Sequence, residues 1–462
     1  MHRHSREGKR RAALQRKRRT RCKRRERRGD LFGFRAAFEA LWPGRTPPAL
    51  PRRRGRRPRV ALKALVTALV FHVMQRSGTL AEHFALLFDD YLSDAACSDR
   101  RQRLPWQVFE ELMQWALRPL ARRRRHGEGF WRGWRLVALD GTQFSLCNTP
   151  QNQGAVAKAK TRRGQAAFAK ITTGVLLELG LHNPVAAAIG GHGESEWQLA
   201  GRLLARLPGR ALLLADRLHG CAAFAAGALA ACVRVGSHFL FRARSNLKVR
   251  TLRRLKDGSR LIAVPVREKG RPRHIVRWLT LREIRVRVTR PGHRAQELRL
   301  WTSLVDPQNA PAHELAGLYA QRWEHELYYR QLKRQLRKSE LLQSHTVTTA
   351  AQEIAALVLA SAVLARERQR AAAGQTPVLR VSFMKILELM RPLWLVFALG
   401  PDLLTRGQKQ QLTDRFLRHA RQYLIAPRRS RSCPRALRQP IGGWPRLLKN
   451  ESHEGPIHFQ FA

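Results

Sequence analysis

Two short apolar segments, each ending on an aspartate, constrain the fold of this chain most strongly. Residues 134–139 run Trp-Arg-Leu-Val-Ala-Leu before Asp140, and residues 211–215 run Ala-Leu-Leu-Leu-Ala before Asp216. A carboxylate at the end of a buried strand is costly unless it is paired or binds a metal. Either aspartate alone is more often a turn or capping residue. Together they predict two adjacent strands that present acids at one edge of a sheet.

The charge of the chain makes an acid in an apolar setting more informative. The 462 residues include 88 Lys and Arg against 33 Asp and Glu, a net charge of +55. The first 60 residues hold 23 of these bases and 4 of the acids, so the remainder still carries +36. A field this positive favours a polyanionic partner, and nucleic acid is the usual one. A hydrophobic content of 44% excludes a wholly disordered polycation.

Cysteine spacing and apolar runs exclude several further classes of protein. The six cysteines form no Cys-x2-Cys pair, so we expect neither a zinc finger nor a disulfide framework, and a reducing compartment is favoured. The basic N-terminus has no apolar stretch behind it, which argues against a secretory signal. The longest apolar runs, near 64–71 and 355–365, are shorter than the ~18 residues of a membrane span. We therefore expect a cytoplasmic protein with no membrane partner.

A third acid lies in a helical segment with four notable residues on one face. These are Tyr319, Arg322, Glu326 and Lys333. At about 100° per residue they fall within about 60° of arc, whereas Glu324 lies about 160° from Glu326. A solvated amphipathic helix with i,i+4 ion pairs would account for the charges. It would not account for the alignment of these four residues while Glu324 points elsewhere.

The pattern of expected strands and helices predicts an α/β protein with several regions. We expect strands at 168–179, 184–189 and 238–242, and helices at 31–42, 60–75, 81–92, 105–120, 312–342, 348–372, 381–397 and 408–423. Period-two alternation, as in 284–289, indicates an antiparallel β unit. The regions are a disordered basic arm (1–30), a helical region (31–128), an α/β core (129–245 and 310–370), a β-strand insertion (246–309), and a helical C-terminal region with a basic tail (371–462).

These motifs resemble those of the DDE transposases of bacterial insertion sequences. The resemblance rests on Asp140-Gly-Thr, on Leu-Ala-Asp216-Arg217, and on the signature Tyr-x2-Arg-x3-Glu-x6-Lys, and it covers about residues 129–345. It is closest to the subgroup with a β-strand insertion before the glutamate-bearing helix. It implies a ribonuclease-H-like catalytic core over 129–245 and 310–370, and a DNA-end-binding role for the helical region over 31–128. Three positions depart from the family pattern: Leu218-His219 after Arg217, His325 before Glu326, and Cys147-Asn148.

The resemblance also implies roles for individual residues. Asp140, Asp216 and Glu326 would be the catalytic, metal-binding acids and hold Mg²⁺, or Mn²⁺ in its place, as two ions ~4 Å apart. Tyr319, Arg322 and Lys333 would contact DNA phosphates near the cleaved end, and Arg217 is a further DNA-binding candidate. Trp301 would stack on a flipped base, with cross-strand packing as the alternative.

The function implied by the resemblance is DNA transposition. Such an enzyme cleaves phosphodiester bonds at the inverted-repeat ends of its element and transfers the 3′ ends to target DNA. Its partners would be double-stranded DNA and a second copy of the chain, since two ends must be cut together. Two alternatives stay open: an inactive or repurposed nucleic-acid-binding protein, and a nuclease of the same fold that cuts without strand transfer.

Overall fold

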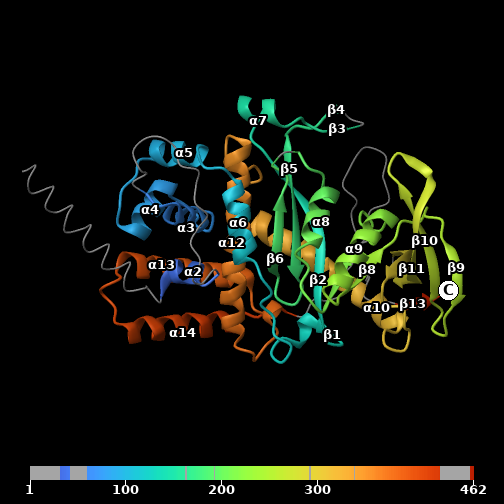
Figure 1. The fold of residues 1–462 in the computed structure, drawn as a ribbon. Coiled ribbons are helices and arrows are strands. Elements are labelled where there is room, and N and C mark those ends of the chain that lie inside the picture. The colour runs from blue at the N-terminus through green and yellow to red at the C-terminus, as the bar shows by residue number, and fades with distance from the viewer. Residues whose placement is uncertain are drawn as a thin grey trace, which may run out of the picture.

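The structure, a computed structural model, has a large mixed sheet at its centre. It describes residues 32–41, 60–161, 164–191, 193–290, 293–337, 339–426 and 458–461. Helices cover the sheet, and a separate group of helices lies at one end of it (Figure 1). The predicted basic arm over 1–30 lies outside the described residues.

Five strands form the core half of the sheet. They are β2 (Trp134–Ser145), β5 (Lys170–Glu178), β6 (Asn183–Ile189), β7 (Ala211–Ala215) and β8 (His238–Arg242). Their order in space is β6-β5-β2-β7-β8. β2, β7 and β8 run parallel, and β5 is antiparallel to both of its neighbours. This order, with one reversed strand beside the central one, is that of a ribonuclease-H-like fold, so the predicted fold class is confirmed.

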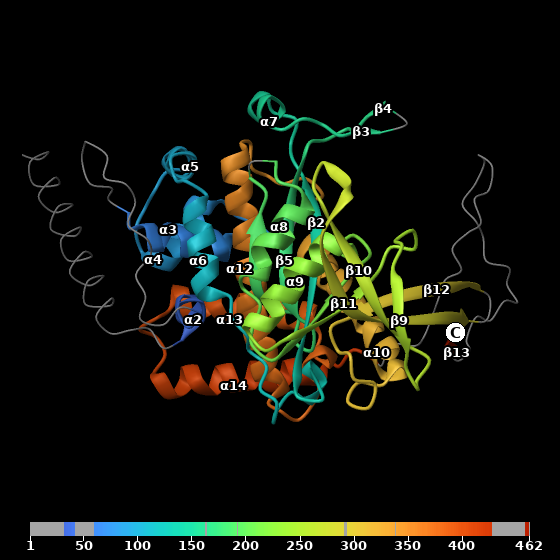
Figure 2. The same cartoon turned by 45° about the vertical axis from the view of Figure 1, so that its right-hand side comes forward.

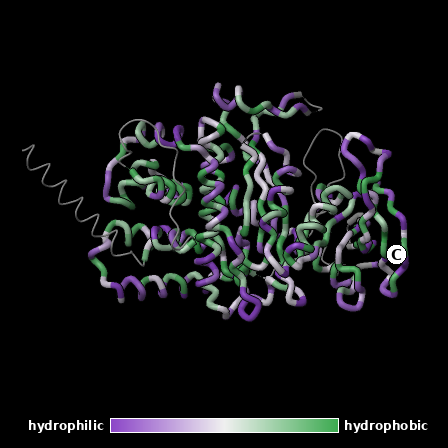
Figure 3. Tube along the Cα trace, viewed as in Figure 1, coloured by the Kyte–Doolittle hydropathy of each residue, from purple (hydrophilic) through white to green (hydrophobic). Residues whose placement is uncertain are grey.

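The central strands are apolar on both sides because helices cover both faces. Leu213 of β7 packs in a hydrophobic cluster with α8 (Glu196–Leu204) and α9 (Ala222–Arg234). Its neighbours Leu212 and Leu214 belong to the other cluster, with α12 (Val347–Ala372) and α11 (Trp323–Arg330). Figure 2 shows α8 and α9 in front of the sheet. In Figure 3 hydrophilic residues gather at loops along the edge of the molecule.

Helix α12 corresponds to the helix expected over 348–372 and contains the apolar run near 355–365. By length and composition it could cross a membrane, but 89% of its apolar window is buried inside the fold. It packs against β6 and against helices on either side of it. A helix that is apolar all round and enclosed by protein is typical of a globular core.

The β-strand insertion continues the same sheet. Its strands are β9 (Arg250–Arg254), β10 (Arg260–Glu268), β11 (Arg271–Arg290) and β12 (His293–Thr302). They are antiparallel, as predicted, and β12 pairs with β8 of the core. One further strand, β13 (His458–Phe461), was not predicted within the basic tail and lies beside β11. The alternation His-Phe-Gln-Phe is compatible with that pairing.

Helices from both ends of the chain form the body beside the sheet. They are α2 (Gly33–Glu39), α3 (Leu62–His72), α4 (Leu80–Phe88), α5 (Asp94–Gln102), α6 (Gln107–Ala116), α13 (Phe383–Leu399) and α14 (Arg406–Gln422). Phe34 of α2 packs edge-on against Trp394 of α13, with ring centroids 5.2 Å apart. The N-terminal and C-terminal helices therefore share one hydrophobic core. The domain boundaries within it stay a prediction.

Short elements complete the chain. They are the 3₁₀ turns Gly127–Gly129 and Val378–Arg380, β1 (Phe130–Trp131), α7 (Pro150–Ala155), β3 (Lys160–Thr161) and β4 (Gly164–Gln165). Helix α5 was not predicted. The single helix expected over 312–342 is divided into α10 (Ala312–Tyr319), a 3₁₀ turn (Ala320–Arg322), α11 and a π-helical turn (Gln331–Leu336).

Candidate active site

The two aspartates lie next to each other on adjacent parallel strands. Leu139 of β2 pairs with Ala215 of β7, so Asp140 and Asp216 follow paired positions. Asp216 comes directly after the end of β7, as predicted. Asp140 does not end its strand, because β2 continues to Ser145 and pairs with β5 over that length. The sheet therefore presents Asp140 from within a strand and Asp216 from a strand end.

Asp140 lies in a setting that disfavours its charged form. Its side chain is 15% exposed, and its Oδ1 accepts a hydrogen bond from the amide of Gly141 at 2.9 Å. Burial and the neighbouring charge of Asp216 raise the pKa of Asp140 to about 7. The hydroxyl of Tyr329 in α11 donates a hydrogen bond to the Asp140 carbonyl oxygen at 2.7 Å, which holds the strand backbone at Asp140.

Asp216 is held in its ionised form by donors from the loop that follows it. The Leu218 amide and His219 Nδ1 lie 2.8 Å and 3.0 Å from its Oδ1. Burial alone would raise the pKa of Asp216, but the His219 contact and the Leu218 amide lower it overall. His219 is one of the departures from the family pattern, and here it orients one of the acids.

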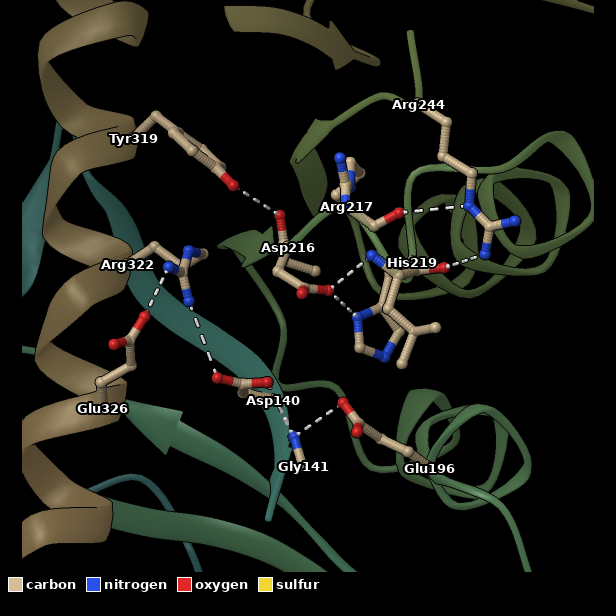
Figure 4. A network of polar contacts seen from close by, with 12 residues as sticks. Asp140, Gly141, Glu196, Asp216, Arg217, His219, Arg244, Tyr319, Arg322 and Glu326 are labelled. Atoms are coloured by element: carbon tan, nitrogen blue, oxygen red, sulfur yellow. Dashed lines mark hydrogen bonds and ion pairs between the residues drawn. The ribbon is translucent and has the colours of Figure 1, made fainter. Parts of the chain in front are cut away.

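Glu326 reaches the same place from the helix that packs on the sheet. Arg322 lies between the acids, with one guanidinium nitrogen 2.8 Å from Glu326 Oε1 and the other 3.6 Å from Asp140 Oδ2 (Figure 4). Glu324 faces away and bonds to His182 Nε2 at 2.8 Å. The structure thus brings together Asp140, Asp216 and Glu326, and it places the two glutamates on different sides of the helix as the helical phase predicts.

The other predicted residues lie around this cluster. The Tyr319 hydroxyl is 3.3 Å from the Ala215 carbonyl oxygen, and Lys333 Nζ is 2.7 Å from the Gln143 carbonyl oxygen. Burial and the charges of Arg337 and Lys170 lower the pKa of Lys333 to about 8. Arg217 is exposed beside Asp216.

Trp301 is placed differently from the other DNA-contact candidates. It is 0% exposed, and its Nε1 donates to Glu283 Oε2 at 3.1 Å inside the sheet. A ring enclosed in this way cannot stack on a base in this conformation. The observed burial favours the packing alternative over the predicted DNA contact of Trp301, because the ring lies within a hydrophobic cluster on the sheet.

Comparisons with known proteins decide the family. A family model described as "Transposase DDE domain" matches residues 131–363, about half of the chain. The chain belongs to the DDE transposases. It is 28% identical over 234 residues to the transposase InsG for insertion sequence element IS4 of Escherichia coli (strain K12), which covers 50% of this chain and 51% of InsG. It is 30% identical over 131 residues to the putative transposase InsZ of the same organism, 28% of this chain and 42% of InsZ.

The matched part spans about half the length of these curated relatives, or less. Among solved structures, the piggyBac transposase of a synaptic complex with hairpin DNA matches with a TM-score of 0.43 and 9% identity, over 79% of both chains. Both curated relatives are named as transposases.

One residue of the transposase site, Glu196, was missed as a candidate. It is the first residue of α8, where Ser195 and Gln198 form a capping box. Its carboxylate accepts a hydrogen bond from the Gly141 amide at 3.1 Å. No local signal could have revealed this, since its partner lies on β2, 55 residues earlier.

The donor set of the site fits a hard divalent cation. Carboxylate oxygens are the ligands that Mg²⁺ prefers. Burial and the charges of Asp216 and Glu196 raise the pKa of Asp140, so the acids lie close enough to repel one another. Within the described residues, no three His, Cys, Asp or Glu side chains already converge to metal-binding distance. The Arg322 guanidinium supplies positive charge between Asp140 and Glu326, so a cation there requires Arg322 to shift.

Proposed function

We propose that this transposase cleaves phosphodiester bonds at the inverted-repeat ends of its element and transfers the 3′ ends to target DNA. One observation carries the proposal: Asp140 and Asp216 follow paired positions of adjacent strands, and the Arg322 guanidinium bridges Asp140 to Glu326 on the facing helix. Three acids thus gather at one point of a chain with a net charge of +55.

The catalytic residues would act as oxygen ligands. Mg²⁺ ions, or Mn²⁺, held by Asp140, Asp216 and Glu326 would stabilise the charge on the attacking and leaving oxygens. His219 and the Leu218 amide keep the Asp216 carboxylate in one orientation. Tyr329 holds the backbone of Asp140. When DNA enters, Arg322 is in place to exchange its carboxylate partners for a phosphate, which its planar fork can bind in bidentate fashion.

The partners we propose are double-stranded DNA and a second copy of the chain. Tyr319, Arg322, Lys333 and the exposed Arg217 surround the acids and would contact phosphates near the cleaved end. Cutting two ends together requires at least a dimer in the synaptic complex. We propose that the protein acts on nucleoid DNA in the bacterial cytoplasm.

The test uses a plasmid that carries the gene with its natural flanking DNA. With Mg²⁺, the full-length protein should nick at the repeats that flank the gene and join the freed ends to a second plasmid. Asp216→Asn should remove both activities, while Asp99→Asn, at an exposed acid of α5, should leave them unchanged.

The alternatives predict different results. Binding in Ca²⁺ without cleavage in Mg²⁺ would indicate a nucleic-acid-binding protein. Cleavage without joining would indicate a nuclease. If no binding to the flanking DNA is found, or if Asp216→Asn retains full activity, the proposed function is wrong.

A further inference from the structure

A fourth carboxylate, that of Glu196, reaches the site from the opposite side to Glu326. Glu196 is the first residue of α8, yet its side chain leaves its own helix and contacts β2. The Gly141 amide lies 3.1 Å from Glu196 Oε1 and 2.9 Å from Asp140 Oδ1. One N–H group therefore holds an oxygen of each carboxylate, and Figure 4 shows Asp140 between Glu326 and Glu196.

The absence of a side chain at Gly141 makes this approach possible. A Cβ atom at this position would lie 2.3 Å from Cγ and 2.4 Å from Cδ of Glu196. Contacts that short do not occur between carbon atoms, so any other residue would displace Glu196. The glycine of the Asp140-Gly141 pair thus creates the space that the fourth carboxylate fills.

The charge of Glu196 is poorly compensated by the protein. Among the described residues, no Lys or Arg forms a salt bridge with it, although Glu194, two residues earlier, pairs with Arg202 at 3.0 Å. Burial and the charge of Asp216 raise the pKa of Glu196. A half-buried carboxylate beside two other acids is unfavourable unless a cation joins them.

An orphaned nitrogen at the same place also points to a missing ligand. His219 is 0% exposed and bonds to Asp216 through Nδ1, but its Nε2 is buried without a hydrogen-bond partner among the described residues. Figure 4 shows its ring between Asp216 and Glu196. Buried polar atoms are almost always satisfied, and water around a bound cation would satisfy this one.

We propose that Glu196 is a fourth metal-binding acid, which shares a divalent cation with Asp140 on the side away from Glu326. The inference rests on the proposed function, because it assumes that the acids of the site bind metal. A glutamate at a helix N-terminus is also favourable through the helix dipole. That role does not require contact with the amide of a neighbouring strand, nor a glycine to make room for it.

Direct measurement of Mn²⁺ binding tests the proposal without recourse to activity. Free Mn²⁺ is titrated with full-length protein and followed by its electron paramagnetic resonance signal. Glu196→Gln should weaken the binding of one ion about tenfold or more, the scale on which metal sites respond to lost supporting groups. Glu194→Gln, the matched control, should bind as the wild type does.

Two further variants keep the outcomes separate. Glu196→Asp retains the charge on a shorter side chain, so it should bind Mn²⁺ more tightly than Glu196→Gln. The melting temperatures of both variants are compared with that of the wild type to confirm that they fold. If Asp140→Asn loses Mn²⁺ while Glu196→Gln binds normally, the assignment of Glu196 is wrong and the proposed function stands. If neither the wild type nor Asp140→Asn binds Mn²⁺, both proposals fail.

Discussion

Replacing Asp140 by Asn should stabilise the metal-free protein at alkaline pH. Burial and the charge of Asp216 raise the pKa of Asp140 from 3.8 to about 7, and its side chain is 15% exposed. The folded chain therefore holds this proton up to about pH 7, whereas the unfolded chain releases it near pH 3.8. Below pH 3.8 the Asp140 carboxyl does not lower the free energy of unfolding. Between pH 3.8 and 7 it lowers this free energy increasingly, and above pH 7 the loss is constant.

The size of the effect follows from the two pKa values. One pKa unit corresponds to ~1.4 kcal/mol, so the penalty at pH 8 amounts to about 4 kcal/mol at most. Asparagine cannot ionise, and it keeps the shape of the side chain. We expect Asp140→Asn to raise the free energy of unfolding by about 2–4 kcal/mol at pH 8 and by less at pH 5.

The assay is thermal unfolding in EDTA at pH 5 and pH 8. A gain of 1 kcal/mol raises the melting temperature of a domain of this size by about 2–4 °C. Asp99→Asn is the control for removal of an exposed carboxylate. Adding Mg²⁺ should stabilise the wild type and leave Asp140→Asn unchanged, because the variant lacks the charge that the metal neutralises. A variant that is less stable than the wild type at pH 8 would refute the reasoning.

Three other outcomes are expected. Removal of residues 1–30 should weaken DNA binding without abolishing it. The affinity of the truncated protein should still fall steeply with salt, and each phosphate contact should contribute about −0.9 to the slope of log affinity against log salt concentration. A truncated protein without salt-sensitive affinity would place the binding surface in the arm. Trp301→Ala should lower the free energy of unfolding in urea by about 3–5 kcal/mol, whereas Trp278→Ala, which removes a ring that is 54% exposed, should change it little. Gly141→Ala should displace Glu196 and slow nicking more than tenfold, which is ~1.4 kcal/mol of barrier, with DNA affinity in Ca²⁺ unchanged; full activity would contradict the close contact.

The features that were predicted correctly depend on short-range patterns. The apolar run of β7 and the phase of Tyr319, Arg322 and Glu326 are set by neighbouring residues, so the adjacent aspartates and the orientation of Glu326 were predictable. The capping box at Ser195 is likewise local, since its two partners are three residues apart.

The features that were missed depend on contacts between distant parts of the chain. β2 continues past Asp140 because β5 pairs with it up to Ser145. Trp301 is buried because β12 joins β8. Glu196 reaches Gly141 only once α8 packs on the sheet. In each case the contacting partner lies far away in the sequence, so the residues next to Ser145, Trp301 or Glu196 do not predict the contact.

A comparison of Glu326→Gln with Glu324→Gln tests the central claim most directly. The two residues are alike in type and only two positions apart in sequence, but Glu326 contacts Arg322 in the site and Glu324 contacts His182. The measurement is a time course of strand nicking in Mg²⁺, on duplexes that carry the repeats flanking the gene. Binding is checked in Ca²⁺. We expect Glu326→Gln to abolish nicking while binding is retained, and Glu324→Gln to change the rate by less than tenfold, ~1.4 kcal/mol of barrier. Equal losses in both variants, or a loss in Glu324→Gln alone, would contradict the account.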